Sequence, residues 1–234
     1  EQCEARGVSF RFNTYAEAAD VTALDPDVVF VATGGLPNTG IVGQGGELVT
    51  SSWEIVSGEV KPGAEVIVYD DNGGHPGMQA AETIARAGSK LEIVSPERFF
   101  APEMGGLNHV PYAEVFHEAG VRITINSRLH SVARQGNKLK ALIGSDYGGR
   151  TEERLVDQVV VEHGTLPLDE LYFALKPRSK NLGAIDWRAL LRGCDPLREV
   201  NAEASFFLMR IGDAVASRNI HAGIYEALRL SKDL

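Results

Sequence analysis

A glycine-rich stretch, Asn72-Gly73-Gly74-His75-Pro76-Gly77, stands between a short apolar run and an amphipathic segment. Strand, glycine-rich turn and helix in this order form the phosphate-binding corner of dinucleotide-binding folds, where backbone amides and a helix N-terminus face a pyrophosphate. Gly74 would let the backbone approach the phosphates, and Gly77 would let the helix lie close to the sheet. The pattern predicts that Asn72, Gly74 and Gly77 bind a dinucleotide, with NAD(P)H as the candidate.

Two features weaken this match. Asn72 stands where the fingerprint has its first glycine, and Asp70 and Asp71 place two carboxylates beside the expected phosphate. Like charges within a few ångströms repel by ~1 kcal/mol or more in a protein surface environment. The end of the next predicted strand, Ser95-Pro96-Glu97-Arg98, offers both an acid and a base and does not decide between NAD and NADP. A working and a vestigial dinucleotide site both remain open.

The chain also repeats itself. Residues 27–37 (DVVFVATGGLP) return as residues 157–167 (DQVVVEHGTLP), and residues 7–13 return, in the same order, as residues 120–126. Two echoes in one order indicate a duplicated domain, although short valine-rich strands ending in glycine resemble one another in any α/β protein. The duplication requires Val29 and Val160 to lie in equivalent strands of two separate sheets.

The elements that would position these residues alternate between strand and helix, which is typical of a parallel sheet. An antiparallel meander follows, as in inserts of dinucleotide-binding domains. The predicted strands are 66–69, 91–94, 121–125, 129–134, 139–143, 156–161 and 204–211, and the predicted helices are 78–87, 112–119 and 222–232.

Pro-containing, charged linkers at residues 60–63 and 176–179 delimit an inserted domain. We therefore expect an α/β protein of two Rossmann-like, three-layer domains. Residues 63–176 would form an NAD(P)-binding-like domain, inserted into a first domain made of residues 1–62 and 177–234. The first copy lacks the strand and glycine-rich loop that precede the second echo, and residues 1–6 resemble a helix tail before Gly7. We expect an N-terminally truncated first domain, and hence a C-terminal fragment of a larger polypeptide.

Composition limits the possible functions. The apolar content of 44% and charged content of 24% are those of a soluble globular protein. A net charge of −9 without a basic block argues against nucleic acid and anionic membrane partners. Cys3 and Cys194, the only cysteines, favour a reducing, cytoplasmic location and exclude a Cys-x-x-Cys centre within these residues. His75 has the sequence surroundings of a surface residue, whereas His163 and His221 are expected at strand ends.

Two motifs, Ala32-Thr33-Gly34-Gly35 and Ile211-Gly212-Asp213-Ala214, flank the inserted domain and resemble the FAD-binding half of the two-dinucleotide-domain flavoproteins. The resemblance implies that Gly212 and Asp213 hold the ribityl chain or phosphates of the flavin. It also implies that Ala32, Thr33 and Gly34 run along the cofactor. Gly164, the echo of Gly34, takes the corresponding cofactor-binding place in the second domain.

Residues 69–82, 95–98 and 212–214 resemble, more closely, the C-terminal domains of the 2,4-dienoyl-CoA reductase and trimethylamine dehydrogenase family. Members carry an N-terminal FMN-binding TIM barrel with a 4Fe-4S cluster, which would lie outside this chain. Reductase members pass hydride from NADPH through FAD, cluster and FMN to an enoyl thioester. Amine dehydrogenase members hold only a nucleotide in these domains and pass electrons to an electron-transfer flavoprotein.

The resemblance implies a fragment of an oxidoreductase, inactive alone, that binds FAD or ADP, with NAD(P)H as a possible second ligand and the barrel as a partner. A 2,4-dienoyl-CoA reductase-like activity is the first interpretation. The alternative is an amine or N-methyl amino acid demethylase, which the departure at Asp70, Asp71 and Asn72 slightly favours. We assign no catalytic residue and no metal ligand within this chain.

Overall fold

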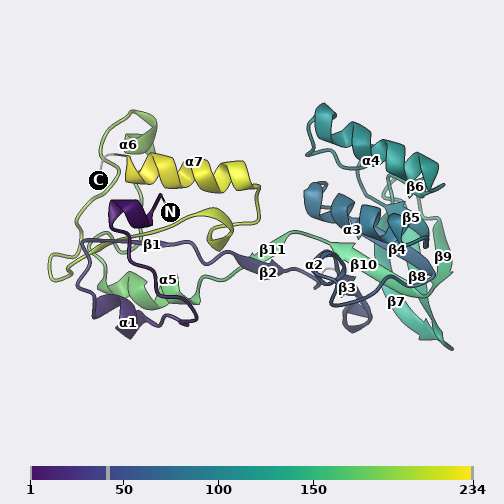
Figure 1. The fold of residues 1–234 in the computed structure, drawn as a ribbon, viewed down its shortest axis with the longest axis horizontal. Coiled ribbons are helices and arrows are strands. Elements are labelled where there is room, and N and C mark those ends of the chain that lie inside the picture. Colours follow the sequence, from purple (N-terminus) through teal and green to yellow (C-terminus); the bar gives the residue numbers. More distant parts are fainter. Residues whose placement is uncertain (1, 41–42, 233–234) are drawn as a thin grey trace. The chain divides into compact units, whose positions relative to one another are not determined.

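The computed structural model describes residues 2–40 and 43–232, which form two compact units (Figure 1). Unit 1 combines the N-terminal segment up to Gly35 with the segment from Pro167 onward, and unit 2 is Leu36–Leu166. These limits differ from the predicted boundaries at 62/63 and 176/177. The reason is that β3 (Thr50–Ser51) pairs with the sheet of unit 2, and α2 (Ser52–Val56) packs on that sheet.

A five-stranded parallel sheet forms the centre of unit 2, in the strand order β3-β10-β4-β5-β6. The remaining bounds of unit 2 are β4 (Glu65–Asp70), α3 (His75–Arg86), β5 (Lys90–Val94), α4 (Gly106–Glu118), β6 (Arg122–Thr124), β7 (Arg128–Gln135), β8 (Lys138–Gly144), β9 (Thr151–Val156) and β10 (Gln158–Glu162). Parallel sheets need both faces covered, and this one is.

Alternate residues of β4 supply the two hydrophobic cores of unit 2. Val66 and Val68 pack against α2, α3 and α4, whereas Ile67 and Tyr69 pack against the antiparallel sheet β7-β8-β9. Unit 2 therefore has three layers, helices over a parallel sheet over a meander (Figure 1). The mixed α/β class with a parallel sheet is as predicted.

One predicted strand is wrong. The run 156–161 is two strands, because Val156 ends β9 in the meander and Gln158 begins β10 in the parallel sheet. Asp157 lies between them, and its carboxylate and amide bond Glu65 at the start of β4. The sequence did not predict β9, whose residues alternate between exposed and half-buried before Val156.

Unit 1 contains a parallel pair of strands, β1 and β12, with a small core around Leu208 and Leu175. Its bounds are η1 (Glu4–Arg6), α1 (Ala18–Thr22), β1 (Val28–Val31), α5 (Glu170–Leu175), η3 (Lys176–Arg178), α6 (Trp187–Leu191), β12 (Phe207–Arg210), η4 (Gly212–Ala214) and α7 (Ile220–Ser231). The strands β2 (Gly35–Pro37) and β11 (Thr165–Pro167) pair where the chain passes between units. Val29 and Val160 thus lie in separate sheets, as the duplication requires.

Several predicted bounds shift. Gly7 ends η1 with φ +77°, as expected after a helix tail, while Glu1 lies outside the described residues. Residues 8–12 form no strand, because no described segment pairs with them. Helix α4 begins before its predicted start and contains Pro111, and α7 begins at Ile220 because Asn219 caps it through the Ala222 amide.

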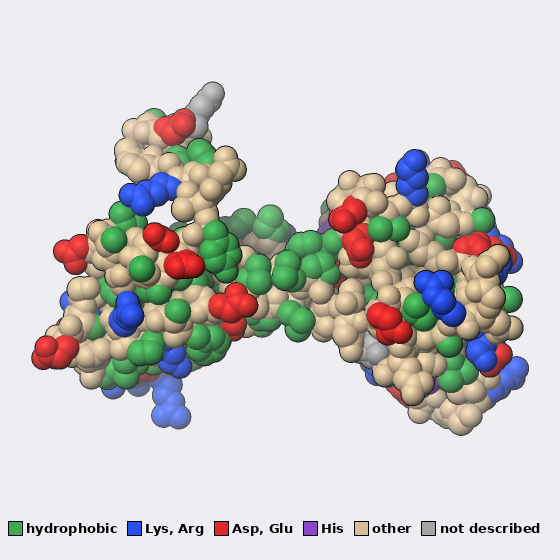
Figure 2. All heavy atoms as spheres, turned by 90° about the horizontal axis from the view of Figure 1, so that it is seen from below, with side chains coloured by type: hydrophobic (Ala, Val, Ile, Leu, Met, Phe, Trp, Pro, Cys, Tyr) green, Lys and Arg blue, Asp and Glu red, His purple; other side chains and the backbone are tan. Residues whose placement is uncertain are grey.

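The described surface has mixed charge. On the face shown in Figure 2, acidic and basic side chains lie interspersed rather than in separate fields. Among the described residues, no helix is both long and apolar enough to cross a bilayer.

A glycine in the loop before β3 provides a test of unit 2 packing. Gly45 has φ +86°, and a Cβ there would lie 1.8 Å from the Val132 carbonyl oxygen. We expect Gly45→Ala to destabilise unit 2 by more than about 2 kcal/mol, since clash and backbone strain add. Gly58→Ala, at φ +78° with open space around it, should cost only about 1 kcal/mol.

Urea denaturation followed by Trp53 fluorescence, in a Trp187→Phe background, measures both variants. Equal urea midpoints for Gly45→Ala and Gly58→Ala would contradict the packing of the Gly45 loop on β7.

Candidate functional site

The glycine-rich loop of unit 2 connects the end of β4 to the start of α3. Asp70 ends β4 with 1% of its surface exposed. Its Oδ1 accepts hydrogen bonds from the backbone amides of Asn72, at 3.1 Å, and Gly73, at 2.9 Å. The structure therefore turns these loop amides toward a carboxyl group of the chain itself.

A second buried carboxylate lies on the neighbouring strand. Glu162 ends β10, is 3% exposed, and is the register partner of Asp70. Its Oε1 accepts from Asn72 Nδ2 at 3.0 Å and from the Gly164 amide at 2.9 Å. Its Oε2 accepts from the hydroxyl of Ser52, the first residue of α2. Two of the predicted cofactor-binding residues, Asn72 and Gly164, thus contact Glu162, and Gly74 caps the N-terminus of α3 two residues after Asn72.

The third acid, Asp71, lies beside His163 and Arg128. His163 Nδ1 lies 2.5 Å from Asp71 Oδ1, and Arg128 Nη1 lies 3.8 Å from Oδ2. The Tyr69 hydroxyl donates to Asp71 Oδ2 at 3.4 Å. Burial raises the pKa of Asp71 and of Tyr69. His163 lies directly after β10 as predicted, and it faces an acid of the chain.

The carboxyl group of Asp70 has a raised pKa. Burial, together with the nearby charge of Glu162, raises the pKa of Asp70 to about 7, although the Gly73 and Asn72 amides act in the opposite direction. The Arg128 guanidinium and the His163 ring lie beside Asp71 and not beside Asp70. Asp70 therefore holds a proton in part of the neutral range.

The second candidate site lies in unit 1, where β1 and β12 end side by side. Val31 is the register partner of Arg210, and the Ile211 amide donates to the Val31 carbonyl at 3.0 Å. Ala32-Thr33-Gly34 and Gly212-Asp213 follow these strands, so the structure brings the two predicted motifs to one sheet edge. The carboxyl ends of parallel strands are the usual ligand-binding edge.

Two residues that the sequence analysis did not single out position this edge. Glu226 of α7 accepts from the Gly212 amide at 2.8 Å and pairs with Arg218 at 2.5 Å. Arg210 pairs with Asp169 at 2.7 Å, donates to the Ala214 carbonyl at 3.2 Å and lies 4.6 Å from the Tyr172 ring centroid. The one sequence signal for Arg210 is a cation at the end of an otherwise apolar strand.

The loop at Gly212 also packs closely on α7. Gly212 has φ +63°, and a Cβ on Gly223 would lie 3.5 Å from its Cα. The Asp213 carboxylate accepts from the Arg218 amide at 3.2 Å, which fixes the turn that leads into α7. An acidic side chain held at a sheet edge suits the hydroxyl groups of a ribose or ribityl chain.

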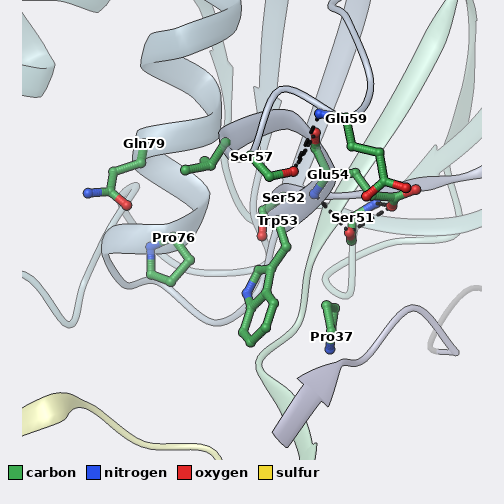
Figure 3. A pocket seen from close by; sticks show the side chains of 10 residues that line it. Pro37, Ser51, Ser52, Trp53, Glu54, Ser57, Glu59, Pro76 and Gln79 are labelled. Carbon is green, nitrogen blue, oxygen red and sulfur yellow. Dashed lines mark hydrogen bonds between the residues drawn. The ribbon is translucent and has the colours of Figure 1, made fainter. Parts of the chain in front are cut away.

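A cleft of about 570 Å³ lies between α2 and the first turn of α3 in unit 2 (Figure 3). The Trp53 indole lies between Pro76 and Pro37 in this view, and Glu54 is bonded to Ser51 in a capping box. No motif in the sequence marks this cleft, because its lining comes from segments distant in the chain.

The two other histidines named from the sequence lie elsewhere in the fold. His75 is exposed and lies edge-on to Tyr112, with the ring centroids 6.2 Å apart. His221 lies in the first turn of α7 and not at a strand end, which corrects the prediction. Among residues 2–40 and 43–232, no three His, Cys, Asp or Glu side chains group as metal ligands would.

Comparison with known proteins gives close relatives. No family model matches the chain. A probable N-methylproline demethylase of Rhizobium meliloti (strain 1021) is 54% identical over 234 residues, which is 100% of this chain and 34% of that protein. An N,N-dimethylglycine/sarcosine dehydrogenase of Chromohalobacter salexigens is 39% identical over 237 residues, which is 97% of this chain and 34% of that protein.

Among solved structures, a 2-naphthoyl-CoA reductase complex superposes with a TM-score of 0.74 at 21% identity, over 100% of this chain and 31% of that chain. This likeness shows the fold. The chain spans about a third of the length of the relatives it matches. Along nearly its whole length, the chain is therefore similar to part of larger demethylases and dehydrogenases.

The raised pKa of Asp70 has a consequence for stability. Between the ordinary value of 3.8 and about 7, the folded protein holds a proton that the unfolded chain has released. Stability should therefore fall as pH rises through this window, and remain lowered above it. Asp70→Asn keeps an acceptor oxygen for the two amides and removes the charge, so we expect it to flatten this dependence and to stabilise unit 2 at pH 8 by about 1 kcal/mol or more.

Urea midpoints measured from pH 5 to 8 check this expectation. Asp146→Asn, at an exposed pair with Arg128, is the matched control and should retain the parent's slope. An Asp70→Asn variant with the same slope as the parent would contradict the assignment.

Proposed function

We propose that this chain is the nucleotide-binding part of a longer flavin-dependent oxidoreductase that demethylates an N-methylated amino acid. The observation that carries this proposal is the 54% identity, over the whole chain, to a probable N-methylproline demethylase. The relative at 39% identity is named for N,N-dimethylglycine and sarcosine, which are also N-methylated amino acids.

In this proposal unit 1 holds FAD or ADP. Ala32, Thr33 and Gly34 line one side of the site and Gly212 and Asp213 the other, at the joint end of β1 and β12. Asp213 accepts hydrogen bonds from cofactor hydroxyl groups. Arg210 and Glu226 hold the Gly212 turn in place from either side.

The oxidation itself belongs to the polypeptide outside this chain. The proposed partner is an N-terminal TIM barrel with FMN and a 4Fe-4S cluster, and the proposed electron acceptor is an electron-transfer flavoprotein. The flavin supplies the two-electron chemistry when bound, and the residues of this chain hold and orient a nucleotide.

The duplication supports an incomplete first domain. In unit 2 the repeated strand β10 has neighbours on both edges, β3 and β4. Its echo in unit 1, β1, has only β12 as a neighbour among the described residues. We propose that polypeptide outside this chain supplies the equivalents of β4 and β5, and that residues 7–13 become a strand beside the equivalent of β5, as β6 does in unit 2.

The 2,4-dienoyl-CoA reductase interpretation needs NADPH to bind at the glycine-rich loop of unit 2. Asp70 and Glu162 occupy that place, and both contact the loop amides or the Asn72 side chain. The geometry therefore supports demethylation better than enoyl reduction.

Anaerobic addition of substrates to the full-length flavoprotein tests the proposal. We expect N-methylproline or sarcosine to bleach the flavin absorbance, and the unmethylated amino acid, proline or glycine, to leave it unchanged. Bleaching by NADPH, with none by any N-methylated amino acid, would contradict the proposal.

Asp213 should contribute to retention of the unit 1 nucleotide. We expect Asp213→Ala in the full-length protein to lower the nucleotide content after purification several-fold, measured by chromatography of the denatured supernatant. Glu199→Gln, at an exposed position of the same unit, is the control and should keep full content. Unchanged content in Asp213→Ala would remove Asp213 from the site.

A further inference from the structure

The glycine-rich loop of unit 2 has the sequence order of a phosphate cradle but a different set of contacts. In a dinucleotide-binding fold, the amides of this loop and the first turn of the helix point at a pyrophosphate. Here the Asn72 and Gly73 amides are bonded to Asp70. Pro76, in the first turn of α3, has no amide hydrogen to offer.

The third glycine of the pattern makes room for the same carboxyl group. A Cβ on Gly77 would lie 2.8 Å from Asp70 Cγ and 2.9 Å from its Oδ2. The space beside the first turn of α3 is therefore filled by Asp70. A carboxyl group at a helix N-terminus is the electrostatic equivalent of the phosphate that this corner holds in other folds.

Glu162 completes the set from β10. It binds the Asn72 side chain, the Gly164 amide and the Ser52 hydroxyl, so both of its carboxylate oxygens already have partners within the protein. Among the described residues, neither Asp70 nor Glu162 forms an ion pair with a Lys, Arg or His. An added phosphate would meet two buried acids that no described Lys or Arg neutralises through an ion pair.

The loop is also fixed from its outer side. Gly73 has φ +70°, and a Cβ there would lie 2.6 Å from the Pro102 ring. The Glu103 amide donates to the Gly73 carbonyl at 3.1 Å, and Ala101 beside it is buried. Residues 101–103 thus hold the loop in the conformation that turns its amides toward Asp70.

The other copy of the repeat provides an internal comparison. Aligning residues 27–37 with 157–167 puts Ala32 at the position of Glu162, and Gly34 at that of Gly164. The strand end that is expected to face a nucleotide in unit 1 therefore carries a small neutral side chain, and the one in unit 2 carries a buried acid.

We infer that the loop of unit 2 is a self-occupied phosphate cradle, in which Asp70 and Glu162 exclude NAD(P)H. The two acids determine which electron donor the protein accepts. Only the statement about the electron donor rests on the proposed oxidoreductase function. The exclusion of NAD(P)H is a property of unit 2 itself.

Calorimetric titration of the full-length protein with NADPH and with NADH tests the inference. We expect no saturable binding to the parent protein up to about 1 mM. Asp70→Ala/Glu162→Ala, which empties the cradle and gives β10 the alanine of β1, should bind at least one of the two nucleotides at least tenfold more tightly. The control, Glu114→Gln/Glu118→Gln, removes the same charge from exposed positions of α4 and should not bind.

Circular dichroism verifies the fold of each variant. If the double alanine variant is unfolded, Asp70→Ser/Glu162→Gln keeps hydrogen-bonding groups at both positions and takes its place. Micromolar binding of either nucleotide to the parent overturns the inference, and so does a folded variant that gains no binding.

The inference and the proposed function fail separately. Binding of NADPH without flavin bleaching contradicts only the self-occupied cradle. Absence of bleaching by every N-methylated amino acid, with no NADPH binding, contradicts only the proposed function.

Discussion

The arrangement of unit 2 depends on two carboxyl groups buried side by side at the ends of β4 and β10. The register that pairs Asp70 with Glu162 is fixed by the alternation of Val66 to Tyr69 between two hydrophobic cores, so neither acid can turn away without moving a whole strand. Buried acids without cationic partners are stable only when they are hydrogen-bonded or protonated. The loop amides, Asn72 and Ser52 supply the bonds, and the raised pKa of Asp70 supplies the proton.

The sequence predicted the main elements because their signals are local. The apolar runs of β4 and β5, the glycine-rich turn and the amphipathic α3 can each be read within one short window. The division of residues 156–161 into two strands at Asp157 could not be predicted from a short window. Val156 and Gln158 belong to different sheets, and their pairing partners lie far along the chain. Residues 8–12 echo the segment that contains β6 but form no strand, because a strand needs a hydrogen-bonding neighbour and none pairs with them among the described residues.

The placement of the glycine-rich loop was predicted, since Asn72, Gly74 and Gly77 lie between the end of β4 and the first turn of α3. Cofactor binding by these residues stays a prediction. The charge of Asp70 was recognised as an obstacle to that binding. The role of Gly77 was not recognised. The motif predicts only that Gly77 lets the helix lie close to the sheet, whereas in the structure Gly77 packs against Asp70. Glu162 was missed entirely. Its contact with Asn72 follows from the order of the strands in the sheet, which the spacing of residues along the sequence does not indicate. Arg210 and Glu226 were missed for the same reason.

The two copies of the repeat share a backbone conformation at one strand end but differ in the side chain there. Gly34 and Gly164 both have positive φ, and their carbonyls accept from Leu168 and Asn38, each just past one of the paired strands β11 and β2. The backbone plan is therefore the same in both units. The two units differ in the side chain two positions before that glycine, which is Ala32 in unit 1 and Glu162 in unit 2. A methyl group would leave the sheet edge free for the proposed nucleotide, whereas a buried acid must find donors within the protein. It finds them in the amide of Gly164 and the side chains of Asn72 and Ser52, where a cofactor would otherwise be met.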